Sequence, residues 1–105
     1  MNSTNRGHKL LTEELKQSLP APYSQEDNPD PMVWVKFFSP YSQWTWFATE
    51  FDPKDEVFFG LVKGFEEELG YFSLDELEEV TVFGDVPGVE RDIHWEPRPL
   101  SEVRS

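Results

Sequence analysis

WTWFATEF, residues 44–51, reads as a β-strand that carries large side chains on both faces. Because successive side chains of a strand point to opposite faces, strict alternation places Glu50 beside Trp46 on one face and Phe51 beside Phe47 on the other. Thirteen of the sixteen aromatic residues lie within residues 34–72. Each aromatic side chain can bury roughly 150–250 Å². We therefore expect a core in this region, with both faces of the sheet covered.

Further strands are expected on both sides of this one, because apolar and polar residues alternate there between turn signals. Their ranges are residues 32–39, 57–65, 69–72 and 89–95. Val33, Val35 and Phe37 would share one face of the first of these strands. Gly60 and Gly64 indicate a bend, a bulge or a close backbone approach in the second. Short turns between successive strands predict an antiparallel meander of about four or five strands.

Two short helices are expected to pack with this sheet. Thr12 can cap the first helix and Pro20 ends it. Ser73 and Glu76 form a capping box that opens the second helix, over residues 74–80. The predicted fold class is therefore α+β.

Length and composition indicate a single domain over residues 10–103, preceded by a flexible N-terminus over residues 1–9. The chain has no cysteine, so it forms neither disulfides nor thiolate metal sites. No apolar run approaches the roughly 18 residues of a membrane span, and no apolar leader is present. We therefore expect a cytoplasmic protein.

Negative charge is concentrated in one part of the chain. The net charge is −12, and residues 50–80 alone hold eleven acidic residues and two lysines, which gives −9. Such a field repels nucleic-acid phosphates and anionic membranes and attracts basic partners at low salt. We expect a basic protein partner and no direct contact with nucleic acid or membrane. A surface that serves solubility alone is the competing interpretation.

Six carboxylates form the acidic patch expected to bind this partner: Glu66, Glu67, Glu68, Asp75, Glu78 and Glu79. They do not follow the Asp-x-Asp-x-Asp-Gly spacing of a calcium loop. We therefore expect no metal, no cofactor and no catalytic residue in the patch.

An enzyme is the alternative interpretation, and it depends on the expected strand at residues 89–95. Glu90, Asp92 and His94 would point to one face of that strand, because residues two apart share a face. Two carboxylates and an imidazole in one row suit a divalent metal or an acid–base pair. The competing interpretation is a polar outward face on which His94 pairs with Asp92.

A second alternative is a binder of single-stranded nucleic acid. Trp34, Phe38, Trp44 and Trp46 could form a platform on which bases stack. Such sites also need a basic groove, and only Lys36 lies nearby in the sequence. There are two competing interpretations. The aromatic residues pack in the core of a monomer, or they form the interface of a homodimer.

Four ordered blocks resemble a family of small acidic bacterial proteins of unknown function: WTWFATEF at 44–51, FFGLV at 58–62, ELGYFSLDEL at 68–77 and ERDIH at 90–94. The resemblance covers residues 10–103. Proteins of this family are carried largely on plasmids and integrative mobile elements. The resemblance implies no established activity and no catalytic residue. It implies genetic neighbours concerned with conjugation, plasmid maintenance and evasion of host defence.

In that context we expect a non-enzymatic interaction protein. Mobile elements encode small acidic proteins that imitate the phosphate field of DNA and occupy the basic clefts of restriction or CRISPR enzymes. A domain of this size with a net charge of −12 fits such a role physically, because it can hold carboxylates on a rigid scaffold. DNA mimicry that inhibits a host-defence protein is therefore the most specific form of the prediction.

Overall fold

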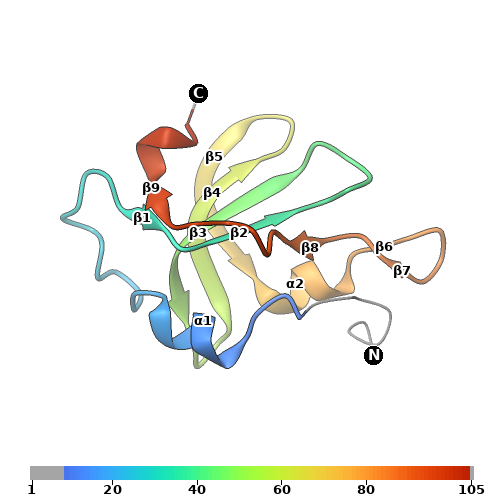
Figure 1. Cartoon of the computed structure of the whole chain (residues 1–105), viewed down its shortest axis with the longest axis horizontal. Helices are drawn as coiled ribbons and strands as arrows, with labels where there is room; N and C mark the ends of the chain where they lie inside the picture. The colour runs from blue at the N-terminus through green and yellow to red at the C-terminus, as the bar shows by residue number, and fades with distance from the viewer. Residues whose placement is uncertain (1–8, 105) are drawn as a thin grey trace.

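A five-stranded antiparallel sheet forms the centre of the protein (Figure 1). The computed structural model describes residues 9–104. The strands of this sheet are β2 (Val35–Phe38), β3 (Thr45–Asp52), β4 (Val57–Lys63), β5 (Glu67–Ser73) and β8 (Glu90–Arg91). Their order in the sheet is β5-β4-β3-β2-β8. From β2 to β5 each strand pairs with the next one along the chain, so the predicted meander is confirmed.

Shorter elements surround the sheet. They are α1 (Glu13–Ser18), β1 (Met32–Val33), α2 (Leu74–Glu79), β6 (Thr81–Val82), β7 (Val86–Pro87), β9 (Arg98–Pro99) and the 3₁₀ helix η2 (Leu100–Glu102). β1 pairs with β9, and β6 pairs with β7. This arrangement confirms the α+β class. None of the helices within residues 9–104 is long and apolar enough to cross a membrane. The flexible N-terminus expected at residues 1–9 lies, apart from Lys9, outside the described residues.

Both helices begin where local sequence signals predict. The Thr12 hydroxyl accepts a hydrogen bond from the Leu15 amide at 3.2 Å. In the capping box, the Ser73 hydroxyl accepts from the Glu76 amide and the Glu76 carboxylate accepts from the Ser73 amide, each at 3.0 Å. These bonds satisfy backbone donors that a helix start otherwise leaves without partners.

A β-bulge in β3 changes which face its last residues occupy. The pairing of β3 with β4 shifts between Ala48 and Glu50, and the extra residue, Thr49, donates its hydroxyl to the Phe59 carbonyl at 3.1 Å. Phe51 therefore joins Ala48 in the core on one face, while Glu50 lies on the other face, paired with Phe59. The expected strict alternation along residues 44–51 is wrong after Ala48, because one inserted residue reverses the pattern.

Gly60 lies opposite Ala48 in β4, next to the bulge. A Cβ atom at this position would collide with the carbonyl oxygen of Phe47. The close backbone approach predicted for Gly60 is confirmed.

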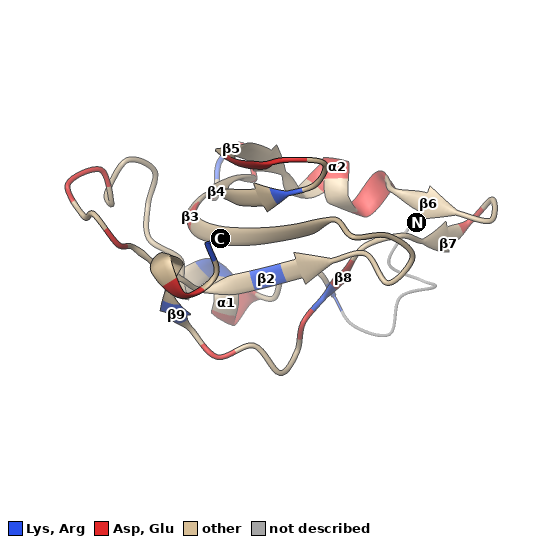
Figure 2. Ribbon diagram, turned by 90° about the horizontal axis from the view of Figure 1, so that it is seen from above, with Lys and Arg blue, Asp and Glu red and all other residues tan. Residues whose placement is uncertain are grey.

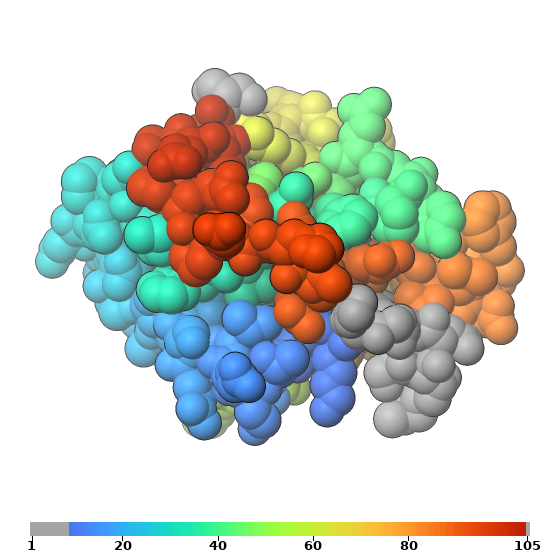
Figure 3. Space-filling model, viewed as in Figure 1, coloured from blue at the N-terminus to red at the C-terminus, as the bar shows by residue number. Residues whose placement is uncertain are grey.

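Two clusters of buried residues cover the two faces of the sheet. The first core joins β2, β3, β4 and β5 to α2 and to the residues that flank α1, and Leu15 of α1 packs against it. Its members are Leu10, Leu11, Leu19, Val35, Phe37, Ala48, Phe51, Phe58, Phe72, Leu74, Leu77 and Val89. The second core joins Val33, Phe47, Leu61 and Leu100, with Trp95 and Val103 packed against it. In Figure 3 the C-terminal segment, in red, lies over the strands of the sheet. The expectation that both faces are covered is confirmed.

The first expected strand is interrupted at Trp34, whose amide donates to the Ala48 carbonyl at 2.9 Å. Val33, before the break, belongs to the second core, whereas Val35 and Phe37 belong to the first. The prediction that these three share a face is therefore wrong for Val33. The cause is the pairing of β1 with β9, which takes this segment out of the main sheet.

Candidate functional site

The six carboxylates of the expected acidic patch fall into two groups. The turn cluster (Glu66, Glu67 and Glu68) lies at the start of β5, and the helix cluster (Asp75, Glu78 and Glu79) lies on α2, which follows the end of β5. Seven extended residues span roughly 20 Å, so β5 separates the two clusters. Figure 2 shows acidic residues both beside β5 and along α2. The sequence suggests one patch, and the structure divides it.

Few cations of the described chain neutralise these clusters. Lys63 pairs with Glu67 at 3.5 Å. Within residues 9–104, no ion pair with Lys or Arg forms at Glu66, Glu68, Asp75 or Glu79. All four of these carboxylate residues are exposed. Most of the negative charge of the two clusters therefore faces solvent.

The end of α2 carries charge of the unfavourable sign. Glu78 and Glu79 lie in its last turn, and that turn has no basic residue. The C-terminal end of a helix is the negative end of its dipole, where a carboxylate destabilises by roughly 0.3–1 kcal/mol. Glu78 and Glu79 therefore do not serve the stability of α2, whereas Asp75 lies in its first turn, where a carboxylate is favourable.

Glu90, Asp92 and His94 do not form the predicted row. β8 ends at Arg91, and the Asp92 carboxylate accepts a hydrogen bond from the His94 amide at 3.0 Å. A bond from a side chain to the backbone two residues ahead makes a turn, which ends the strand here. The expected strand over residues 89–95 is therefore wrong beyond Arg91, and His94 meets Asp92 through its backbone.

Asp92 is also engaged by the sheet, because its carboxylate lies 3.8 Å from the Lys36 ammonium group. No group of three or more His, Asp or Glu residues within residues 9–104 is arranged to hold a metal ion.

The expected stacking platform is divided between core and surface. Trp34 and Trp46 pack against the first core. Trp44 stacks on Trp46 with ring centroids 6.0 Å apart and contacts the exposed Phe65 at 5.7 Å. Lys36, the cation near this stretch in the sequence, lies over the Trp95 ring at 5.8 Å and pairs with Asp92. Core packing is thus found for Trp34 and Trp46.

A cleft on the second face of the sheet was not foreseen from the sequence. It consists of two adjoining pockets of about 470 Å³ and about 200 Å³ that share four lining residues: Tyr23, Glu50, Phe59 and Tyr71. We call it the Glu50 cleft. The loop at residues 21–31 forms one side of the larger pocket, and Leu100 and Arg104 line it as well.

Glu50 holds this loop against the sheet. Its side chain is buried, and its two carboxylate oxygens accept hydrogen bonds from the amides of Tyr23 at 2.9 Å and Gln25 at 3.0 Å. The Phe51 amide donates to the Pro20 carbonyl at 3.0 Å. A buried carboxylate is tolerated only when it is hydrogen-bonded, and the loop amides provide these bonds. The bulge at Thr49 is what turns Glu50 towards the loop.

One sequence signal could have revealed this site. Glu50 stands between Thr49 and Phe51 in an aromatic strand that is buried on both faces. A carboxylate in such a strand requires nearby hydrogen-bond donors, and the backbone amides of a neighbouring loop can supply them. The polar loop at residues 21–31 was the available source.

The pKa of the Tyr71 phenol is shifted by its neighbours in the cleft. A side-chain hydrogen bond with Tyr23 raises the pKa of Tyr71 above its ordinary value of 10.0. Desolvation and the charges of Glu50 and Glu26 raise it further. Four carboxylates line the two pockets, against a single described Arg, so the cleft is negatively charged; they belong to Glu26, Glu50, Asp52 and Asp55.

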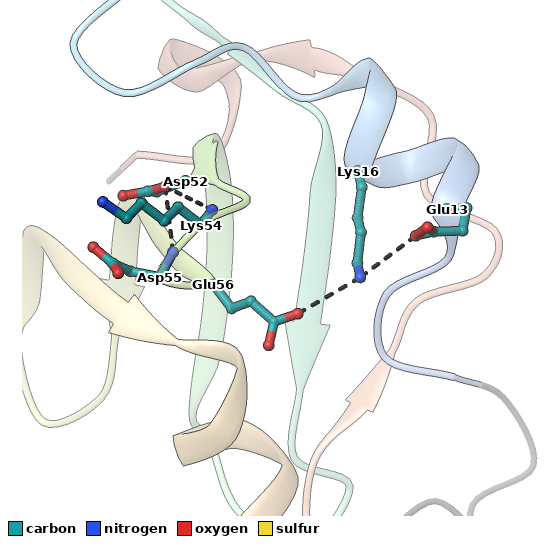
Figure 4. A network of polar contacts seen from close by, with 6 residues as sticks. All are labelled: Glu13, Lys16, Asp52, Lys54, Asp55 and Glu56. Atoms are coloured by element: carbon teal, nitrogen blue, oxygen red, sulfur yellow. Dashed lines mark hydrogen bonds and ion pairs between the residues drawn. The ribbon is translucent and has the colours of Figure 1, made fainter.

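The smaller pocket of the cleft is lined on one side by the turn between β3 and β4. Figure 4 shows the polar contacts of this turn. The Asp52 carboxylate accepts hydrogen bonds from the amides of Lys54 at 2.9 Å and Asp55 at 3.4 Å, which fixes the turn. Nearby, the Lys16 ammonium group pairs with Glu13 at 3.4 Å and with Glu56 at 3.5 Å. Asp52 and Asp55 line the smaller pocket, and no described Lys or Arg does.

Together, the meander, the two covered faces and the acidic clusters define a small acidic α+β domain. Residues 10–103 match the family described as "Protein of unknown function (DUF2958)", and the chain belongs to this family. The resemblance to a family of unknown function over these residues is confirmed. No curated protein and no solved structure matches the chain.

Proposed function

We propose that this protein is a non-enzymatic interaction protein that binds a basic protein partner through its acidic surface. The observation that carries the proposal is the pair Glu78 and Glu79 of the helix cluster, which lie in the last turn of α2, where a carboxylate destabilises the helix. Charge needed for solubility alone would be accommodated equally well at the favourable end of a helix. Placement against the dipole supports a role in binding.

The overall field supports the same partner. With a net charge of −12, the protein attracts basic surfaces over about one Debye length, roughly 8 Å at physiological salt. Nucleic acid and anionic membranes are repelled by this field. The partner is therefore a protein rich in Lys and Arg, which the chain meets in the cytoplasm.

In its most specific form, the proposal is that the protein serves a bacterial mobile element as a DNA mimic. The partner would then be a nucleic-acid-binding host-defence enzyme of the restriction or CRISPR type, inhibited when carboxylates occupy its phosphate sites. Support comes from the two carboxylate clusters, which the ends of one strand hold roughly 20 Å apart on a rigid scaffold.

Capture from host lysate on the immobilised protein tests the proposal, with the retained proteins identified by mass spectrometry at low and high salt. The variant Asp75→Lys/Glu79→Lys should release a basic nucleic-acid enzyme that the wild type retains at low salt. Glu96→Lys/Glu102→Lys is the matched control, because it changes the net charge equally at exposed sites that belong to neither cluster.

Three results would count against the proposal or against its most specific form. Equal retention by the wild type and the α2 variant would show that the helix cluster is not the binding surface. Equal losses in the α2 variant and in its control would show that only net charge matters. The DNA-mimic form has a test of its own, in which the wild-type protein is added to the retained enzyme. The enzyme should lose its DNA-cleaving activity, and full activity would refute DNA mimicry.

A further inference from the structure

We propose that the Glu50 cleft binds an organic ammonium group, such as the end of a lysine side chain. This inference deepens the proposed function, because a basic partner protein presents such groups.

Aromatic rings form the walls of the cleft. The rings of Phe59 and Tyr71 have centroids 5.0 Å apart and planes inclined at 61°, so they enclose a corner. Tyr23, from the loop, lines both pockets together with Phe59 and Tyr71. Tyr23 and Tyr71 are each 63% exposed, which leaves their rings open to a ligand. A cation within about 6 Å of a ring centroid is attracted by the ring face, and angled rings contact it from two sides.

Carboxylates set the sign of the ligand charge. Glu50 lines both pockets, Asp52 and Asp55 line the smaller pocket, and Glu26 lines the larger one. Arg104 is the single basic residue among the described lining residues, and it belongs to the larger pocket. The ammonium group therefore binds in the smaller pocket, and the hydrocarbon part of the ligand lies in the larger pocket.

The hydrogen bonds of Glu50 leave part of its carboxylate available. A carboxylate has about four lone-pair positions, and the amides of Tyr23 and Gln25 use one on each oxygen. The same bonds hold the backbone of Tyr23 at φ 64°, in the left-handed region that a bulky side chain seldom adopts. The ring of Tyr23 is thus placed before any ligand arrives, which lowers the entropy lost on binding.

An ammonium group fits the cleft better than a metal ion does. Metal sites use converging oxygen or nitrogen ligands, and no such group of three is found within residues 9–104. Aromatic walls with carboxylates at their edges suit a cation that carries hydrocarbon, because the rings accept both its charge and its apolar surface.

Calorimetric and NMR titrations of the purified chain test the inference. The probes are Nα-acetyl-lysine methylamide, choline, and 3,3-dimethylbutan-1-ol, which has the shape of choline without its charge. We expect both cations to bind and to shift the resonances of Tyr23 and Tyr71, and the neutral alcohol to bind at least about tenfold more weakly.

The variants localise the binding. Tyr71→Leu should weaken cation binding by about tenfold, Tyr71→Phe should preserve most of it, and Asp55→Asn should weaken it less than Tyr71→Leu does. Tyr41→Leu is the control, because Tyr41 is an exposed tyrosine that contacts Phe83 instead of the cleft. Equal binding of choline and its neutral analogue, or an unchanged Kd in Tyr71→Leu, would overturn the inference.

The two proposals fail separately. The variant Asp75→Lys/Glu79→Lys should weaken choline binding less than Tyr71→Leu does, because neither Asp75 nor Glu79 lines the cleft. Capture of a basic partner with no cation binding would remove the cleft inference alone. Cation binding with no salt-dependent capture would remove the acidic-surface proposal alone.

Discussion

Replacing Glu50 by Gln should loosen the loop at residues 21–31 and destabilise the whole domain. Each carboxylate oxygen of Glu50 now accepts one amide, from Tyr23 at 2.9 Å and from Gln25 at 3.0 Å. A glutamine side chain keeps one acceptor and turns an NH₂ group towards the other amide. One of the two loop amides therefore loses its partner and faces another donor.

The size of the effect follows from this geometry. A buried donor left without a partner costs about 1–3 kcal/mol, and Glu50 itself is only 7% exposed. The neutral amide is easier to bury than a carboxylate, which offsets part of this loss. We expect the free energy of unfolding to fall by about 1–3 kcal/mol, out of the roughly 5–15 kcal/mol that is usual for a domain.

Urea unfolding followed by tryptophan fluorescence measures the change in stability, with Glu14→Gln as the control. Glu14 is exposed on α1, so its substitution should change stability by less than about 0.5 kcal/mol. Cleavage by a glutamate-specific protease measures the loop directly, because Glu26 lies within it. Faster cleavage after Glu26 is expected in Glu50→Gln. A variant that matches the wild type in both the urea midpoint and the rate of cleavage would refute the reasoning.

Three further predictions concern the sheet, α2 and the cleft. Gly60→Ala should lower stability by about 1–3 kcal/mol in thermal unfolding, because the new methyl group meets the Phe47 carbonyl, whereas Gly70→Ala, where a Cβ meets nothing within 4 Å, should change it little. Ser73→Ala should lose about 0.5–2 kcal/mol in urea unfolding through loss of the helix cap; an unchanged midpoint would mean that the capping box adds nothing. The raised pKa of Tyr71 means that the folded state favours its neutral phenol. The contribution of this phenol to the free energy of unfolding is complete below pH 10.0, and it is lost as the pH rises through the pKa of the folded state. Absorbance titration should show one phenol ionising later than the others, and that late step should vanish in Tyr71→Phe.

Local signals predicted the helices well. Thr12 and the pair of Ser73 and Glu76 lie within four residues of the amides they bond, so the sequence contains both partners side by side. The meander could be predicted from the sequence for a related reason, because each strand from β2 to β5 pairs with the next one along the chain.

Features that depend on partners far away in the sequence could not be predicted. The reversal at Glu50 arises from the bulge at Thr49, whose hydroxyl is bonded to Phe59 ten residues away. Val33 changes face because β1 pairs with β9, at the opposite end of the chain. The end of β8 at Arg91 follows from a local bond of Asp92, yet alternation in residues 89–95 outweighed that signal in the sequence. The cleft depends on both the bulge and the loop, so no single stretch of sequence contains it.

The second core has a consequence for synthesis on the ribosome. The strands β3 and β4 supply Phe47 and Leu61 to it, but Leu100 and the adjoining Trp95 and Val103 are made tens of residues later. The helices and strands of the first core can therefore assemble while one apolar face of the sheet is still bare. Exposed strands with apolar surface are prone to aggregate in partly folded chains. The final dozen described residues are thus the last to cover the second face of the sheet. A nascent chain that stalls before Trp95 would expose Phe47 and Leu61 to chaperones and proteases.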